Sequence, residues 1–306
     1  MDSDRPKIFI PNRFKEHVIS DNESDKYLFS NSRNDFVVYS IETWLQHLTP
    51  PIYPHRKSVT SFLFLSSGNA VKSCGLDTFS MQQNSICVVP QGYLTSTMEI
   101  SPEATGFYCH FDFSIFPIWR IQNLKRMFPF LFTDEHPHLT LDEVSSQALS
   151  FLLQRLELEF RNNRETPNFD LISSYLVCAF QEMKRFYPDE QAEKSTRNAQ
   201  ITSEFKELLY NEIKGTKSAA EFAEKLNVSP NHLNKSVKTT TGKTAKELIN
   251  EALILEAKNL LFETDLSIAE VALELGMEDA AYFSRLFKQH SGETPQSFRK
   301  MIEKSK

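Results

Sequence analysis

The segment Ser218-Ala-Ala-Glu-Phe-Ala-Glu-Lys-Leu226 recurs further along the chain as Ser267-Ile-Ala-Glu-Val-Ala-Leu-Glu-Leu275. Each copy opens with a serine three residues before a glutamate, which is the pattern of a capping box at a helix start. Each also carries an alanine, Ala223 or Ala272, that is small enough for two short helices to cross closely. The repeat therefore predicts one helical unit that the chain contains twice.

A turn and a second helix follow each copy. Asn227 and Gly276 stand in the two turns, and both residue types tolerate a left-handed backbone. A third predicted helix, residues 245–262, joins the two units; at about 1.5 Å per residue it is ~27 Å long. Two helices around a short turn form a helix-turn-helix, whose second helix enters the major groove of DNA. The alternative is a helical pair used only for packing, and two copies in register disfavour it.

The end of the chain reads Gly292-x-Thr294-Pro295-x-x-Phe298-Arg299. With this signature, residues 201–306 closely resemble the AraC/XylS-type transcription regulators of bacteria. The front half resembles, more loosely, the cupin-like effector and dimerisation domain of that family. The resemblance implies a sequence-specific regulator with two recognition helices in successive major grooves of promoter DNA. It also implies a small-molecule effector, contact with RNA polymerase if the protein is an activator, and a second copy as a homodimer partner.

The resemblance places the first recognition helix at residues 230–241 and the second at the matching positions after residue 279. Asparagine can pair with adenine, and lysine or arginine can reach guanine acceptors. Lysines further along each helix and the threonine caps are expected at phosphates, which position a protein without reading sequence. The first helix should carry more sequence information, because alanines stand beside the polar residues of the second. The expected DNA-binding residues are Asn231, His232, Asn234, Lys235, Lys238, Thr244, Tyr282, Ser284, Arg285, Lys288 and Thr294.

The apolar residues of both units are expected to be buried, so that changing them would unfold the unit rather than alter its specificity. They are Phe222, Leu226, Val228, Leu233 and Val237 in the first unit and Val271, Leu275, Met277, Phe283 and Phe287 in the second.

Net charge does not produce a DNA-binding surface here. The chain carries a formal charge of −6, and from Ile201 onward it has 15 Lys plus Arg against 16 Asp plus Glu. Nucleic-acid-binding domains usually have a basic surface patch or a net positive charge. The basic side chains of residues 201–306 must therefore gather on one face.

The front half has the pattern of a β-rich domain. The chain has 306 residues, which favours two domains, and its 40% hydrophobic and 24% charged residues are typical of globular proteins. Between Phe36 and Phe116, short apolar runs alternate with turn residues, which favours a barrel or sandwich. Phe107, Cys109 and Phe111 alternate with polar residues, as in a half-buried strand. The predicted fold class is α+β multidomain, with a cupin-like β-barrel in front and an all-α domain behind.

Two helices are predicted after the barrel, as a hairpin that either covers it or pairs with a second subunit. The first is expected behind a capping box formed by Thr140 and Glu143, and the second behind Thr166-Pro167. The expected buried stripes are Val144, Ala148, Phe151, Leu152, Leu156 and Phe160, then Phe169, Ile172, Leu176, Ala179, Phe180, Met183 and Phe186. Residues 1–139 are thus the cupin-like effector-binding domain, 140–187 the hairpin, 188–200 a linker and 201–306 the DNA-binding domain.

The barrel pattern does not predict an enzyme, a metal or a cofactor. Asn84-x5-Pro90-x-Gly92-x2-Thr95 has the spacing of the second cupin motif, in which metal-binding members carry histidine where Thr95 stands. His55 and His110 are isolated, whereas a catalytic metal needs about three converging ligands. Two alternatives stay open: a metal-free cupin-type enzyme fused to a DNA-binding domain, and a front half that only dimerises. No residue is assigned to effector binding.

Cysteine usage and hydropathy predict a cytoplasmic protein without a membrane partner. Cys74, Cys87, Cys109 and Cys178 are scattered, so buried reduced thiols are expected. The N-terminal stretch lacks an apolar run of signal-peptide length, and nowhere do about 18 apolar residues follow one another.

Overall fold

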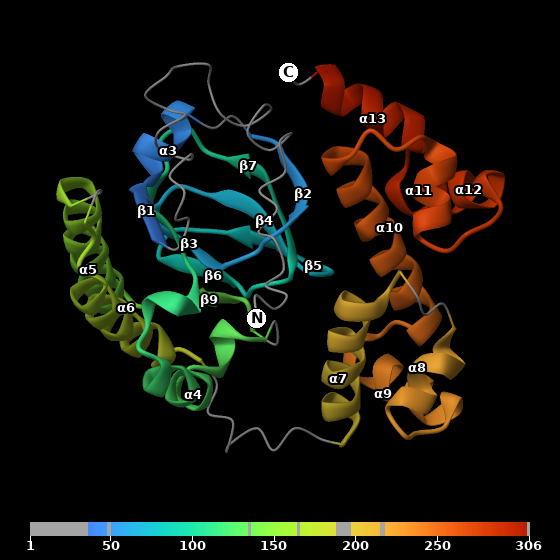
Figure 1. The fold of residues 1–306 in the computed structure, drawn as a ribbon, viewed down its shortest axis with the longest axis horizontal. Helices are drawn as coiled ribbons and strands as arrows, with labels where there is room; N and C mark the ends of the chain where they lie inside the picture. Colours follow the sequence, from blue (N-terminus) through green and yellow to red (C-terminus); the bar gives the residue numbers. More distant parts are fainter. Residues whose placement is uncertain are drawn as a thin grey trace, which may run out of the picture.

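The computed structural model describes residues 36–47, 50–133, 136–163, 166–187, 197–214 and 218–304. Two lobes make up the molecule (Figure 1). The N-terminal lobe holds all the described strands, with helices against one of its sides. The C-terminal lobe is entirely helical and lies along the opposite side.

The strands form two antiparallel sheets. The first has the order β1-β8-β3-β6-β9, and the second β2-β7-β4-β5. The described strands therefore form a double-layered sandwich, and the expected closed barrel is not found among them. Their bounds are β1 Phe36–Ser40, β2 Ile52–Arg56, β3 Thr60–Ser67, β4 Ala70–Cys74, β5 Asp77–Met81, β6 Ser85–Val89, β7 Leu94–Ile100, β8 Thr105–Phe111 and β9 His138–Thr140.

Side-chain alternation divides the first sheet into two faces. In β8, Phe107, Cys109 and Phe111 pack with the hairpin helices, as the alternation predicted. Tyr108 points the other way, into a smaller core shared with Cys74 and Met81 of the second sheet. Such a division follows from the two-residue period of a strand.

Helices α5, Glu143–Asn162, and α6, Phe169–Lys184, form the predicted hairpin against the first sheet. Shorter helices complete this lobe: α3 Ile41–His47, α4 Ile118–Met127 and the 3₁₀ turns Phe113–Ile115 and Pro129–Leu131. The residues that α6 buries are Ile172, Ser173, Leu176, Ala179, Phe180 and Met183. This agrees with the predicted stripe except at its two ends.

The predicted start of α5 was wrong, and its predicted buried face was right only in part: Leu156 is buried and Leu152 and Phe160 pack against the core, but Val144 and Phe151 do not. Asp142 caps the helix by accepting a hydrogen bond from the Ser145 amide, because Thr140 is held in strand β9. Asn168, rather than Thr166, caps α6 in the same way. Helix α5 buries Leu149, Leu153 and Leu156, and it leaves Val144, Phe151 and Leu158 exposed. Since apolar residues lie on both faces of this helix, its period alone could not choose between them.

Seven helices form the C-terminal lobe within the described residues. They are α7 Arg197–Glu212, α8 Ala219–Lys225, α9 Pro230–Thr241, α10 Ala245–Glu263, α11 Ile268–Glu274, α12 Ala280–Ser291 and α13 Pro295–Lys304. Helix α7 begins inside the stretch 188–200 that was expected to be a linker, and residues 188–196 lie outside the described residues. The joining helix α10 matches its expected bounds to within one residue.

The two lobes share a core along strand β2 and helix α10. The Tyr53 ring lies 5.9 Å from that of Phe262 and 5.7 Å from that of Phe298. Beside it, Arg56 Nη2 lies 2.5 Å from Oε2 of Glu256, whose side chain is 1% exposed. Lys214 Nζ lies 3.2 Å from the other carboxylate oxygen. The joint thus combines an aromatic contact with a buried ion pair.

Three of the four cysteines are buried, as expected. Cys74, Cys87 and Cys109 are buried and not joined in a disulfide, whereas Cys178, also not in a disulfide, is exposed on α6, which corrects the expectation for that residue. None of the described helices is long and apolar enough to cross a membrane.

Candidate nucleic-acid interface

The first repeated unit consists of α8, a turn and α9. The Ser218 hydroxyl accepts a hydrogen bond from the Glu221 amide at the start of α8, as the capping pattern predicted. Asn227 holds the turn with a φ of +52°. The Val228 amide then donates to the carbonyl of Ala223, which ties the turn to the first helix at the small residue. Ser229 caps α9, with Pro230 in its first turn.

The second unit, α11 and α12, repeats this construction. Ser267 and Glu270 form the complete reciprocal capping box. Gly276 takes the turn position with a φ of +70°, and the Met277 amide donates to the Ala272 carbonyl. The predicted left-handed turn residues are thus confirmed in both units.

Apolar side chains hold each pair of helices together. Of the ten residues expected to be buried, seven are: Phe222, Leu233, Val237, Val271, Leu275, Phe283 and Phe287. Leu226, Val228 and Met277 are half-buried and pack against the same core. Helix α10 is buried along most of its length between the units and the N-terminal lobe. The exposed faces of α9 and α12 are therefore fixed to one rod.

Helix α9 exposes a basic, polar face. Asn231, His232, Lys235 and Lys238 are all exposed, as a base- and phosphate-contacting face requires. Neither lysine makes an ion pair with a described residue. Helix α9 contains no acidic residue. Both ammonium groups are consequently available to an anionic partner.

Asn234 has a structural role that sequence reasoning missed. Its side-chain oxygen accepts a hydrogen bond of 3.1 Å from the amide of Ala245, the first residue of α10. One of the two lone pairs of this oxygen is thus used within the chain, and the expected contact of Asn234 with adenine stays a prediction. Thr239, which was not among the expected residues, is exposed four residues after Lys235 and hence on the same side of α9.

Helix α12 exposes Tyr282, Arg285 and Lys288, as expected. Its N-cap is Asp279, which accepts hydrogen bonds from the amides of Ala281 and Tyr282 at 2.8 and 3.0 Å. These bonds lower the pKa of Asp279, so its negative charge persists at neutral pH. Arg285 Nη2 lies 3.9 Å from this carboxylate, and both side chains are mostly exposed. The second recognition helix thus begins beside a negative charge.

Three expected contacts have hydroxyl groups that are already engaged within the chain. Ser284 Oγ donates to the Ala280 carbonyl at 2.9 Å. Thr244 forms a complete capping box with Glu247 at the start of α10. Thr294 accepts a hydrogen bond from the Ser297 amide in α13. The structure therefore shows Thr244 and Thr294 in helix capping, which is the alternative to a phosphate contact.

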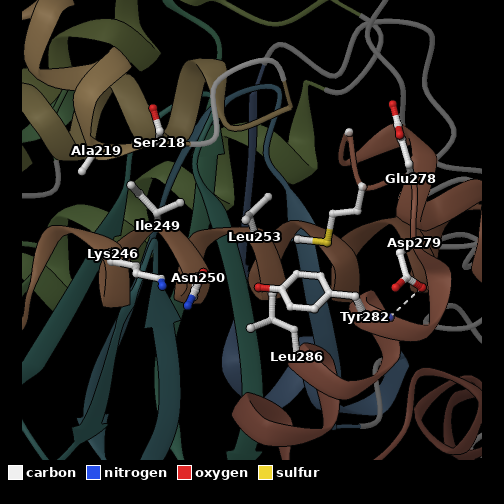
Figure 2. A pocket seen from close by; sticks show the side chains of 12 residues that line it. Ser218, Ala219, Lys246, Ile249, Asn250, Leu253, Glu278, Asp279, Tyr282 and Leu286 are labelled. Carbon is white, nitrogen blue, oxygen red and sulfur yellow. Dashed lines mark hydrogen bonds between the residues drawn. The ribbon is translucent and has the colours of Figure 1, made fainter.

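A hollow of about 470 Å³ separates the two units. Lys246, Asn250 and Leu253 of α10 lie along it, and Tyr282 extends over it from the start of α12 (Figure 2). Ser218, at the start of α8, lies at its other side. The first turns of α8 and α12 thus face each other across α10. Lys246 was not among the expected residues, although its exposure at the start of α10 places it close to both units.

Comparisons with known proteins agree with this geometry. A family described as "Helix-turn-helix domain" matches residues 222–301. The Msm operon regulatory protein of Streptococcus mutans is 30% identical over 114 residues, which are 37% of this chain and 40% of that protein. The bifunctional transcriptional activator/DNA repair enzyme AdaA of Bacillus subtilis is 29% identical over 126 residues, 41% of this chain and 58% of AdaA. The chain thus spans about half the length of the curated relatives that it matches.

Among solved structures, ToxT from Vibrio cholerae aligns over 88% of this chain and 98% of its own, with 16% identity and a TM-score of 0.45. The chain therefore carries, in its last third, a helix-turn-helix domain that is similar to those of bacterial transcription regulators.

Proposed function

We propose that the protein is a transcription regulator that binds specific promoter DNA with α9 and α12 in successive major grooves. The observation that carries this proposal is the pair of helix-turn-helix units on one rod, each with an exposed polar second helix. Such units bind half-sites about one helical turn apart. Contact with RNA polymerase follows if the protein is an activator, and a cytoplasmic location follows from its action on the chromosome.

The two units are proposed to differ in role. Helix α9 offers Asn231 and Lys235 without any competing acid on the helix, so we assign base reading mainly to it. Helix α12 begins beside Glu278 and Asp279, whose charges repel phosphates. We assign it a supporting role through Arg285 and Lys288.

Binding of the full chain to sites selected from random duplex DNA tests this assignment. Replacing Arg285 with alanine should cost about 1–3 kcal/mol on the selected site and relax the preference at one base pair. Replacing Lys238 with alanine should weaken binding to all sequences and make the salt dependence shallower. An equal loss for Arg285→Ala on random DNA, or an unchanged salt slope for Lys238→Ala, would overturn the roles given to these residues.

We also propose that residues 1–139, of which 1–35 lie outside the described residues, form a cupin-like effector-binding domain. Its support is a double sheet with buried polar groups between its layers, joined directly to α10 through β2. A metal-free enzyme and a purely dimerising lobe are the competing assignments. Thermal unfolding in a metabolite screen separates them from an effector domain, since an effector stabilises the protein without being consumed.

A second copy of the chain is the proposed partner of the helical hairpin. Val144, Phe151 and Leu158 are exposed on α5 at intervals of seven residues. This heptad spacing brings apolar residues onto one seam, as in a pair of coiled helices. Pairing of two α5 helices would bury all three side chains.

A further inference from the structure

Three hydrogen-bond donors border the hollow between the two helix-turn-helix units. Lys246 and Asn250 lie about one turn apart on α10, and Tyr282 extends over the same hollow from the first turn of α12. In Figure 2 the side chains of Lys246 and Asn250 point to the same side of α10, and the Tyr282 hydroxyl extends toward Asn250. We call these three side chains the central donors.

The central donors have no side-chain partner in the part of the chain that the structure describes. No hydrogen bond or ion pair there includes Lys246 Nζ, the side-chain amide of Asn250 or the Tyr282 hydroxyl. Lys246 is exposed, Asn250 is half-buried and Tyr282 is 49% exposed. Each can therefore donate a hydrogen bond to a group outside the chain.

The acids that follow Lys246 on α10 do not pair with it. Glu247 is held at the start of the helix in the capping box with Thr244. Glu251 accepts a hydrogen bond of 2.8 Å from Lys243, and it stands five residues after Lys246, on another face of the helix. The ammonium group of Lys246 thus keeps its charge for an external partner.

Two further acids border the hollow at its other end. The Asp279 carboxylate caps α12 and is bound by the amides of Ala281 and Tyr282. In Figure 2, Asp279 lies at the opposite end of the Tyr282 ring from Asn250, and Glu278 points away from that ring. Since like charges repel, an anionic ligand is directed to the end of the hollow that carries the central donors.

The central donors connect the exposed faces of the two recognition helices. Hydrogen bonds at the N-cap of α10 lower the pKa of Glu247, and the nearby charge of Lys238 on α9 adds to this effect. The exposed face of α9 therefore continues onto the first turn of α10, where Lys246 stands. Tyr282 belongs to the exposed face of α12, three residues before Arg285. A duplex that spans both faces must pass over the hollow.

The geometry of DNA decides which of its groups lies there. When two recognition helices occupy successive major grooves, the minor groove between them faces the same side of the duplex. This groove is only about 6 Å wide, so a surface that faces it meets the two phosphate backbones before the base edges. Lysine, asparagine and tyrosine are among the usual side-chain donors to DNA phosphates. The chemistry of the central donors therefore matches the group that the duplex presents.

We propose that the central donors bind a phosphodiester group of the DNA backbone midway between the two half-sites. This inference rests on the proposed function and adds a third contact to those of the two recognition helices. Lys246 supplies the charge, while Asn250 and Tyr282 donate hydrogen bonds to the phosphate oxygens. Such a contact carries no sequence information, but it fixes the register of α10, and hence of both units, on the duplex.

Binding of the full chain to a selected DNA site with single methylphosphonate linkages tests the proposal. A methylphosphonate removes the negative charge of one backbone linkage and leaves the bases unchanged. At a linkage midway between the half-sites, we expect this substitution to weaken binding of the natural protein about tenfold. In Lys246→Met the same substitution should change binding by less than about twofold, because the contact is already lost. No effect of any central linkage on the natural protein, or an equal effect on Lys246→Met, overturns the proposal.

Salt dependence and a matched control separate this contact from general electrostatics. Lys246→Met should reduce the slope of the salt dependence by about 1, whereas Tyr282→Phe should weaken binding without changing the slope, since it removes no charge. Lys243→Met removes an equal charge from a lysine that is paired with Glu251. This control should keep the full methylphosphonate effect. Loss of the effect in Lys243→Met as well as in Lys246→Met overturns the assignment to the central donors.

Exchange of the base pairs midway between the half-sites distinguishes phosphate binding from base reading in the minor groove. The natural protein and Lys246→Met should show the same preference at these positions. A preference that disappears in Lys246→Met shows base reading and overturns the phosphate assignment. Since Lys246 is exposed, the variant should also unfold at the same temperature as the natural protein.

The same binding measurements separate this inference from the proposed function. Specific binding of the natural protein without any effect of a central linkage overturns the phosphate site alone. Failure of the natural protein to bind any DNA specifically overturns the proposed function.

Discussion

The ion pair between Arg56 and Glu256 gives a sharp prediction, because it joins residues of different lobes. Replacing Arg56 with methionine keeps most of the aliphatic stem and removes the guanidinium that lies 2.5 Å from the buried carboxylate. Among the described residues, Lys214, which is about half exposed, would then be the cation that remains beside the carboxylate. The change therefore leaves a buried negative charge with its weaker partner.

The magnitude follows from the burial of the pair. Breaking a buried ion pair costs about 3–5 kcal/mol when the remaining charge has no partner. Since Lys214 stays 3.2 Å from the other oxygen, we expect a loss of about 2 kcal/mol for Arg56→Met. At roughly 2–4 °C per kcal/mol for domains of this size, the unfolding temperature should fall by about 4–8 °C.

A double-mutant cycle with Glu256→Gln isolates the pair. Arg56 also donates to the carbonyl of Gly92 at 2.5 Å, and this loss is common to both Arg56 variants and cancels in the cycle. We expect a coupling energy of about 1–2 kcal/mol from urea unfolding followed by circular dichroism. Additive effects of the two changes would show that the lobes do not meet through this pair, and would refute the reasoning.

Three further predictions concern the recognition helix α12, the hairpin and the joint. Asp279→Asn retains a helix cap but removes a negative charge, so it should tighten binding to all DNA and steepen the salt dependence of binding. Glu278→Gln should have the same effect on binding without affecting the cap. Unchanged DNA affinity in both variants would contradict the proposed repulsion. Phe151→Glu should convert a dimer to a monomer in analytical ultracentrifugation without lowering the unfolding temperature of the monomer, whereas an unchanged mass would reject the α5 seam. Burial raises the pKa of Glu263 to about 7, so the carboxyl stabilises the fold at acidic pH and this contribution is lost as the pH rises through about 7. The difference in free energy of unfolding between Glu263→Gln and the natural protein should therefore shift in favour of the variant by about 1 kcal/mol from pH 5 to pH 8. An equal difference at the two pH values would contradict the assignment.

The repeated units could be predicted closely because their signals are local. Capping serines, left-handed turn residues and the apolar period all act within a few residues of one another, and Ser218, Asn227 and Gly276 lie where the pattern placed them. The same holds for the bounds of α10. A repeat doubles each such signal, which made the second unit as clear as the first.

Contacts between residues far apart in the chain could not be predicted from the sequence. Asn234 has the right chemistry for reading adenine, but the turn after α9 brings the Ala245 amide to its side-chain oxygen. Arg56 and Glu256 are 200 positions apart, and no periodic pattern connects them. In α5, both faces carry apolar residues, so only the position of the sheet decides that Leu153 is buried and Phe151 exposed.

The central claim is that α9 and α12 occupy successive major grooves with unequal roles. Guanine and adenine methylation interference on a selected site, with the full chain, measures it most directly. Two interference patches about 10–10.5 base pairs apart are predicted, of which Lys235→Ala weakens only one and Arg285→Ala only the other. The patch assigned to α9 should contain more positions that are essential for binding. A single patch, or two patches that respond identically to both variants, would contradict the account.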